Sequence, residues 1–316
     1  MQNFTNANPS VFILTFSVIT DLNYLYGGIS LTGYLLIILF NSTVLSTIFV
    51  NQNLHEPMYI FIASLCANGL YGSTSFFPGL LVNLFSKTQL ISYPACMVQI
   101  FCMYSYGSFE MSMLTVMAYD RYVCICNPLR YFTIMTPTKA FSWIIVALVD
   151  SIITTFVLVI LTVRLPLCDN VILKIYCDNW SVVRLSCIDT TVNNLYGFYI
   201  AVETLLVKPF LIMLSYVPIL KVCAKSKDAR AKALQTCTSQ LISLVIFAAN
   251  VLFEILLYRF GPTEVPYAIR VTSSVLFLVV APLTNPLLYG MKMNAIKEKI
   301  MQWFYWKNME ASTKGN

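Results

Sequence analysis

Ionisable side chains stand inside long apolar runs of this sequence, at Glu110, Asp120, Arg121, Glu203 and Lys208. A charged group at the centre of a membrane-spanning helix costs at least about 2.5 to 3.5 kcal/mol on insertion scales, so each group requires a partner or a function. Such groups form hydrogen-bonded networks, ion pairs or the steps of an ion path. Glu203 and Lys208 are five residues apart, which places them on different faces of an α-helix, so we do not expect them to pair.

One stripe of residues in the third apolar run joins two of these ionisable positions. Its members follow alternating steps of four and three residues, the spacing of a single helix face. They are Met103, Gly107, Glu110, Leu114, Met117 and Arg121. Because the stripe carries charges, we expect it to face the inside of a helix bundle. At 1.5 Å per residue, Glu110 lies roughly 16 Å and Met103 roughly 27 Å from Arg121.

Plainer roles stay open for the same groups. Glu110 is equally well explained as a buried acid bound by neighbouring hydroxyls, and Asp120 with Arg121 as an ion pair that anchors the helix end.

The composition requires a lipid environment. Hydrophobic residues make up 58% and charged residues 11% of the 316 positions, with a mean hydropathy of +0.73, against roughly 45 to 50% apolar residues in soluble domains. About 20 helical residues cross a bilayer core. Seven runs are long enough: 25–50, 58–85, 96–125, 140–163, 195–224, 232–258 and 266–289. We predict an all-α fold, a seven-transmembrane helix bundle with a short cytoplasmic interfacial helix.

Lysine and arginine residues decide the orientation, because positive charge collects on the cytoplasmic side. With the N-terminus outside, the inner segments hold 13 of the 20 basic residues, the outer segments hold 6, and Lys208 lies within a span. We predict an extracellular tail over 1–24, the bundle over 25–290 and a cytoplasmic helix and tail over 291–316, in a multi-pass plasma-membrane protein. The net charge of +6 then meets anionic lipid at the inner face, so no nucleic-acid partner is needed.

Segments near the two ends of the chain refine this topology. The apolar stretch 11–19 has no basic residues before it, so a cleaved signal peptide is not expected. Asn3 opens a glycosylation sequon on the outer tail, and Asn179 opens a second in an outer loop. Over 292–307, apolar and basic side chains alternate in the pattern of a short helix on the inner membrane surface.

Four of the ten cysteines fall in or beside outer segments, the oxidising side on which disulfides persist. They are Cys96, Cys168, Cys177 and Cys187. Their three pairings all stay open from sequence alone. Two bridges favour an ordered lid over 165–190, and a solvated connection is the alternative. With a single histidine, His55, and no paired Cys-x-x-Cys spacing, we predict no metal site, cofactor or catalytic set.

Pro286 lies inside the seventh run, where it removes one backbone hydrogen bond and kinks the helix. We expect the neighbouring Asn285 to satisfy the freed carbonyl. A simple kink for packing is the plainer alternative.

The run MAYDRYVCICNPLRY at 117–131 resembles the signature that odorant receptors, a branch of the rhodopsin-like G-protein-coupled receptors, carry after their third helix. Further similar motifs follow in the same order over nearly the whole chain: Pro57-Met58-Tyr59, Ser215-Tyr216, Lys232-Ala233 with Thr236-Cys237, and Asn285-Pro286 with Tyr289. Two positions depart from the pattern. Asn68 stands where the second helix usually bears an aspartate, which puts a sodium site with Glu110 in doubt, and Gln240 stands where many members have histidine. The run NGLYG at 68–72 resembles the fish branch.

The resemblance implies a small-molecule odorant bound in the outer half of the bundle and a heterotrimeric G protein of the stimulatory class that raises cyclic AMP. It also implies the disulfides Cys96–Cys177 and Cys168–Cys187. The residues it assigns to activation and G-protein coupling are Asp120, Arg121, Tyr122, Tyr216, Asn285, Pro286 and Tyr289.

The ligand-pocket candidates follow from helix position in the outer half of the bundle. They are Met103, Tyr104, Gly107, Ser108, Ile200, Thr204, Val251, Leu252, Ile255, Val275 and Leu278. This mostly apolar set suits a small hydrophobic ligand held by few polar contacts, although apolar helix stripes more often only pack.

Other classes of protein remain as alternatives. A non-olfactory receptor for a lipid or peptide fits the same bundle, whereas an amine receptor is disfavoured because Met103 and Tyr104 stand where the outer third helix would carry an aspartate. In a transporter or channel, Glu110, Glu203 and Lys208 would mark an ion path. Seven spans do not divide into the equal halves of an inverted repeat, which argues against a transporter.

Overall fold

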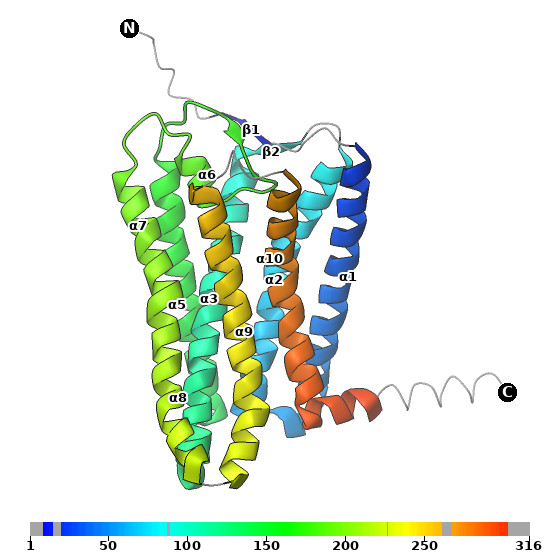
Figure 1. Ribbon diagram of the computed structural model, residues 1–316, viewed down its shortest axis with the longest axis vertical. Coiled ribbons are helices and arrows are strands. Elements are labelled where there is room, and N and C mark those ends of the chain that lie inside the picture. The colour runs from blue at the N-terminus through cyan, green and yellow to red at the C-terminus, as the bar shows by residue number, and fades with distance from the viewer. Residues whose placement is uncertain (1–8, 15–19, 87–88, 226, 261–266, 303–316) are drawn as a thin grey trace, which may run out of the picture.

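The computed structural model describes residues 9–14, 20–86, 89–225, 227–260 and 267–302, and shows long helices side by side in a single bundle (Figure 1). The long helices are α1 (Thr20–Val50), α2 (Pro57–Phe85), α3 (Tyr93–Cys126), α5 (Pro137–Val163), α7 (Thr191–Val202), α8 (Lys208–Lys225), α9 (Lys227–Phe260) and α10 (Tyr267–Lys292). A π-helical turn, η3 (Glu203–Val207), joins α7 to α8. With these three taken as one rod, each of the seven predicted spans coincides with one rod, and the predicted all-α seven-helix fold is confirmed.

Five of the described helical stretches are long and apolar enough to cross a membrane by themselves. They are Asn23–Val50, Pro57–Phe85, Pro137–Val163, Thr191–Lys225 and Cys237–Leu256. α10 reaches this standard only together with the short helix that follows it. α3 is more polar, and its neighbours α2, α5, α8 and α9 surround it. Because protein rather than lipid covers most of α3, its sequence tolerates the charged groups Glu110, Asp120 and Arg121.

Short elements connect the rods, and local sequence fixes where several helices begin. Proline stands in the first turn of α2, α3 and α5, where its missing N–H costs no helical hydrogen bond. The Ser92 hydroxyl accepts from the Ala95 N–H at 3.4 Å and the Thr136 hydroxyl from the Lys139 N–H at 3.3 Å, as N-capping residues do. The short connecting helices are η1 (Gln52–Leu54), η2 (Pro128–Arg130), α4 (Tyr131–Ile134) and α6 (Asn179–Val183).

A small sheet covers one end of the bundle. Its strand order is β2 (Leu90–Ser92), β1 (Val11–Leu14), β3 (Val171–Ile172). β1 pairs antiparallel with β2 and parallel with β3. We predicted no strand here, because the apolar stretch 11–19 was assigned to an extracellular tail over 1–24. The structure instead places β1 at the centre of the sheet, and α1 begins at Thr20, five residues before the predicted span.

Two disulfides hold the same end of the bundle, which we call the disulfide end. Cys96 at the start of α3 bonds to Cys177, and Cys168 bonds to Cys187. Both pairs are those implied by the resemblance, so the lid interpretation of the segment 165–190 is confirmed over the solvated alternative. We call the opposite end of the bundle the Arg121 end.

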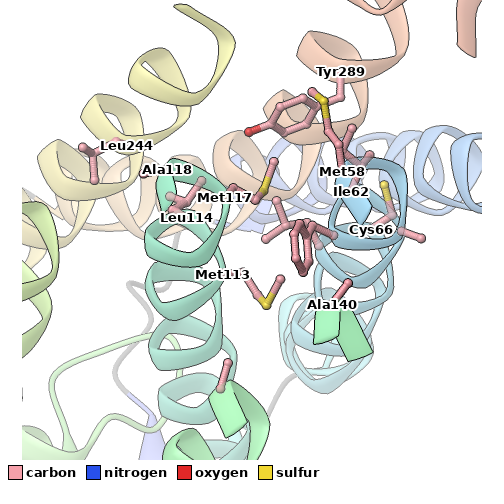
Figure 2. Packing of buried hydrophobic residues seen from close by; sticks show 14 of the residues in the cluster. Met58, Ile62, Cys66, Met113, Leu114, Met117, Ala118, Ala140, Leu244 and Tyr289 are labelled. Carbon is pink, nitrogen blue, oxygen red and sulfur yellow. The ribbon is translucent and has the colours of Figure 1, made fainter. Parts of the chain in front are cut away.

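The buried apolar side chains form two clusters, one toward each end. The cluster at the disulfide end includes Phe12 of β1 and Phe76 of α2. The cluster toward the Arg121 end includes Met113 and Met117 of α3. Figure 2 shows this second cluster, in which side chains of α2 and α3 point into the space between the two helices, beside Tyr289 of α10. The bundle is therefore packed on both sides of its mid-depth.

At the Arg121 end the chain turns sharply out of the bundle (Figure 1). The helix Asn294–Gln302 is bent by 86° from Ser274–Gly290. Its Ile296 is fully buried against the bundle, whereas Lys297 and Glu298 are exposed. This is the short amphipathic helix predicted within 292–307, and the positions 303–307 of that prediction lie outside the described residues.

Substitution of Phe12 tests how much the sheet contributes to the free energy of unfolding. Phe12 is 0% exposed and its neighbour Ile13, on the other face of the strand, is 42% exposed. We expect Phe12→Ala to lower the free energy of unfolding by about 3 kcal/mol or more through the cavity that it leaves. The matched control Ile13→Ala should cost less than about 1 kcal/mol. Melting temperatures of the purified protein in detergent measure both, and equal shifts would contradict the buried role of Phe12.

Candidate functional site

Asp120 and Arg121 form a buried ion pair at the last turns of α3. The Arg121 guanidinium donates to Asp120 Oδ2 through Nε at 3.0 Å and also through Nη2. The Tyr131 hydroxyl, in α4, donates to Asp120 Oδ1 at 2.9 Å. Burial and then the Asp120 carboxylate raise the pKa of Tyr131, so its hydroxyl stays protonated and remains a donor. Tyr122, next in sequence, is half-buried, and its ring lies 6.2 Å from that of Tyr119.

A second polar contact joins α3 to α8 and α9 nearer mid-depth. The Gln240 amide of α9 donates to the backbone carbonyl of Leu114 at 2.5 Å, and its Oε1 accepts from the Tyr216 hydroxyl of α8 at 3.0 Å. Gln240 stands where the resemblance leads one to expect histidine, and its side-chain amide donates one hydrogen bond and accepts one. Tyr289 of α10 is buried in the same cluster of apolar residues as Tyr216.

Glu110 is buried at the middle of α3 and is bound by two side-chain amides. Asn68 of α2 donates to Oε2 at 3.0 Å, and Asn285 of α10 donates to Oε1 at 2.5 Å. Asn68 also donates to the Tyr106 carbonyl at 3.1 Å. In the plainer interpretation of Glu110 neighbouring hydroxyls bind this acid, whereas in the structure two amides do so. Both carboxylate oxygens already accept an N–H, which agrees with the doubt about a sodium site.

The carbonyl freed by Pro286 is satisfied from a different helix than predicted. Pro286 has no N–H for the carbonyl four residues earlier, which is that of Pro282. Asn41 of α1 donates to this carbonyl at 3.0 Å and also to Ile37 O at 2.9 Å. The expectation that Asn285 would serve it was wrong, because the Asn285 amide binds Glu110 instead. The kink thus ties α10 to α1.

Glu203 and Lys208 form an ion pair, contrary to the prediction. Lys208 Nζ lies 3.0 Å from Glu203 Oε1. The prediction assumed α-helical periodicity, but η3 is a π-helical turn, in which hydrogen bonds run from residue i to i+5 and residues five apart share a face. Lys208 also lies 3.8 Å from Asp150 of α5 and donates to the Ser108 carbonyl of α3 at 3.4 Å.

The lid carries a polar cluster that fastens it to α9 and α10. Lys174 Nζ lies 3.3 Å from Glu254 of α9 and 3.6 Å from Asp178. The Tyr176 and Ser274 hydroxyls each donate to Glu254 at 3.2 Å. All five side chains are buried. The Cys177 backbone N–H donates a hydrogen bond to Gln99 Oε1 of α3 at 2.9 Å, which fixes the lid beside its disulfide.

Sequence inspection had passed over two of these acids. Glu254 and Asp150 both stand inside predicted spans, so the criterion that selected Glu110 and Glu203 would also have found them. Asn179, the second sequon, is buried, and its Oδ1 accepts from Thr162 at 2.5 Å, which makes it a poor glycan acceptor. Asn3 lies outside the described residues.

The pocket candidates fall into three groups. Met103, Ser108, Thr204 and Val275 are buried, and Tyr104, Gly107, Ile200, Val251 and Ile255 are half-buried. Leu252 does not belong with them, since it is 48% exposed and shares an outward-facing stripe of α9 with Val245 and Leu256. Leu278 lies in α10, but its side chain is outside the described residues.

The helices that carry the buried candidates approach one another inside the bundle. The Phe247 side chain of α9 packs against α3 at Gly107, where its ring tip lies 3.5 Å from the position that a Cβ would occupy, an ordinary van der Waals distance. A hollow of about 450 Å³ lined by Leu70, Tyr71, Thr74 and Ser75 of α2 contains none of the candidates.

The bundle, its disulfide-bound lid and the buried Asp120-Arg121 pair at the end of α3 define a seven-helix G-protein-coupled receptor. Comparison with known proteins shows which family of these receptors the chain resembles. The sequence matches the olfactory receptor family over residues 30–307. It is 34% identical to human olfactory receptor 52K1 over 314 residues, which cover 98% of this chain and 99% of that protein. It is 35% identical to human olfactory receptor 51I2 over 268 residues, which cover 84% and 86%.

The chain therefore belongs to the olfactory receptor family. This membership favours a membrane receptor over the transporter, channel and enzyme alternatives. The resemblance to the fish branch stays a prediction.

A double-mutant cycle tests the ion pair across η3. We expect Glu203→Gln to lower the free energy of unfolding by about 1 to 3 kcal/mol, because it leaves the buried Lys208 ammonium with weaker partners. Lys208→Met should then cost less on top of Glu203→Gln than it does in the unmutated receptor, because only the more distant Asp150 still faces the ammonium group. Glu298→Gln, an exposed acid on the helix Asn294–Gln302, is the charge-matched control. Additive effects of the two substitutions, measured as melting temperatures, would contradict a direct pair.

The amide contacts of Glu110 predict how the receptor responds to sodium. Because each Glu110 carboxylate oxygen already accepts a side-chain N–H and Asn68 adds no negative charge beside it, we expect the same melting temperature in sodium chloride and in choline chloride. Asn68→Asp replaces one donor by a second carboxylate, and two close carboxylates favour a bound cation or proton. This variant should be less stable in choline chloride and regain stability in sodium chloride. A sodium-dependent melting temperature of the unmutated receptor would contradict the prediction.

Proposed function

We propose that the receptor binds a small organic odorant in the disulfide half of the bundle and activates a stimulatory heterotrimeric G protein, which raises cyclic AMP. One observation carries this proposal: α3 runs from the pocket candidates Met103 and Ser108, past Glu110, to the buried Asp120-Arg121 pair. A single helix thus connects a ligand region with the end at which a G protein would bind.

The lining supports an odorant of mainly apolar character. Met103 and Tyr104 of α3 and Val275 of α10 pack in the cluster at the disulfide end, while Val251 of α9 packs against the other cluster. A ligand among these residues lies where the two clusters meet. Ser108 and Thr204 supply the few hydroxyls that fix the orientation of such a ligand. The lid, held by Lys174 and Glu254, closes this region from above.

The polar contacts at the Arg121 end support a two-state mechanism. In the inactive state Arg121 is bound to Asp120, which Tyr131 also holds. Activation moves the ends of the helices apart and frees Arg121, with Tyr216 and Tyr289 lining the opening. Asn285 and Pro286 take part because they tie the kinked α10 to Glu110 and α1. An odorant drives this change only through a higher affinity for the open state.

The charge distribution supports a plasma-membrane receptor with its N-terminus outside. The disulfide end then faces the oxidising exterior, and a glycan is expected on Asn3. The Arg121 end and the short helix Asn294–Gln302 face the cytoplasm, where lysines of this segment meet anionic lipid. In this proposal the chain divides as predicted, into an extracellular tail over 1–24, the bundle over 25–290 and a cytoplasmic segment over 291–316.

Replacing Arg121 tests the function. In transfected cells, we expect some members of a panel of amino acids, bile acids and volatile organic compounds to raise cyclic AMP through the unmutated receptor. Arg121→Gln should reduce that response at least tenfold while surface expression persists. The variant lacks the Arg121–Asp120 ion pair, whose release is the proposed step of activation. Arg184→Gln, an exposed arginine at the disulfide end, is the matched control and should respond normally. A full response of Arg121→Gln would overturn the assigned role.

A further inference from the structure

Asp150 is an acid on the outer surface of a membrane-spanning helix. It lies 13 residues from each end of α5 (Pro137–Val163), or roughly 20 Å, and therefore at the middle of the span. Its side chain is 52% exposed, and the exposed apolar side chains Val146, Val149 and Ile153 surround it on the helix. An unsatisfied carboxylate facing lipid at this depth is costly, so this face requires an explanation.

Within the chain, Asp150 shares its basic partner, Lys208, with the second acid Glu203. Lys208 lies 3.8 Å from Asp150 but 3.0 Å from Glu203, and it also donates to the Ser108 carbonyl. Two carboxylates thus face one ammonium group, and the cluster carries a net charge of −1 when all three are ionised. Asp150 is both the more distant and the more exposed acid. The negative charge is therefore concentrated on the lipid side, in the seam between α5 and α7, which lie in contact (Figure 1).

The complement of this surface is a positive charge held at the middle of the membrane. A small membrane-soluble amine keeps its charge among the lipid headgroups, and a long basic side chain near a helix end does the same. A basic residue at the midpoint of a spanning helix is fixed at the required depth by the helix itself. Such a residue is as costly in lipid as Asp150, so each group stabilises the other.

A second copy of this chain does not supply that base. Lys208 is buried and already engaged. The other bases of the spans stand within about two turns of a helix end: Arg121, Lys221, Lys232 and Arg270. Two copies facing each other through α5 would bring acid against acid.

We propose that the face of α5 around Asp150 docks a membrane-spanning helix of a different protein that carries lysine or arginine near its midpoint. The contact is an ion pair between that base and Asp150, flanked by apolar packing on Val146 and Ile153. Glu203 and Lys208 position the acid and hold it at the surface.

The test uses a probe helix of leucine and alanine with a single central lysine. The full-length receptor and the probe carry a donor and an acceptor fluorophore, and energy transfer in cell membranes is measured against probe density. Two control probes carry leucine at the centre, or the lysine moved seven residues toward one end. Polar contacts between membrane helices contribute about 1 to 2 kcal/mol, so we expect the central-lysine probe to associate about tenfold more strongly than either control.

Receptor variants separate charge from folding. Asp150→Asn should reduce association with the central-lysine probe to the level of the leucine probe, whereas Asp150→Glu should retain it. Both variants are scored only at equal surface expression and equal melting temperature, and Val157→Asn, a polar change on the same helix, should have no effect. Equal association of all probes, or undiminished association with Asp150→Asn, overturns the proposal. Loss of receptor-to-receptor energy transfer in Asp150→Asn, with probe association unchanged, assigns the face to a second copy instead and also overturns it.

Discussion

The polar groups of α3 have no water to bind at mid-depth, and the rest of the structure is arranged around that constraint. In lipid each unsatisfied polar group costs several kcal/mol. Neighbouring helices therefore supply the partners of α3. Asn68 and Asn285 bind Glu110, Lys208 binds the Ser108 carbonyl, and Gln240 binds the Leu114 carbonyl. Through these contacts α2, α8, α9 and α10 are each tied to the same central helix.

The same constraint makes the bundle suited to switching. Lipid tails are as apolar as the side chains that face them, so apolar burial alone does not select one arrangement of membrane helices. Polar contacts with defined donors and acceptors do select one arrangement. Moving a helix exchanges one hydrogen-bonding partner for another rather than stretching a bond. Asp120, Gln240 and Glu110 each sit at such a contact, and each lies on or against α3. In the proposed mechanism, a small displacement of α3 at the disulfide end would reach the Arg121 end as a change of hydrogen-bonding partners.

The sequence predicted what depends on local periodicity and hydropathy, and it failed where distant contacts decide. The seven runs, the short amphipathic helix within 292–307 and the stripe on α3 follow from residue spacing, and the described residues contain all of them. The pair Glu203–Lys208 was missed because a π-helical turn changes which residues share a face, and nothing in apolar spacing marks such a turn. β1 was missed because a four-residue strand is stabilised by partners about 80 and 160 residues further along the chain. Asn41 of α1 binds the carbonyl that we expected Asn285 to bind, because packing brings Asn41 to Pro282 and turns the Asn285 amide toward Glu110.

The polar cluster of the lid ends on α9 and α10, the two helices that also bind α3 through Gln240 and Asn285. Glu254 holds Lys174 and Tyr176 of the lid and Ser274 of α10. On α9, Glu254 stands 14 residues from Gln240, roughly 21 Å along the helix, and α9 is continuous between them. A ligand that packs beneath the lid and alters the position of Glu254 therefore acts on the same rigid element whose other half binds Leu114 and Tyr216. In the proposed mechanism, the lid, α9 and α3 therefore move together, and the difference in ligand affinity between the two states of the bundle sets how strongly a ligand drives the change.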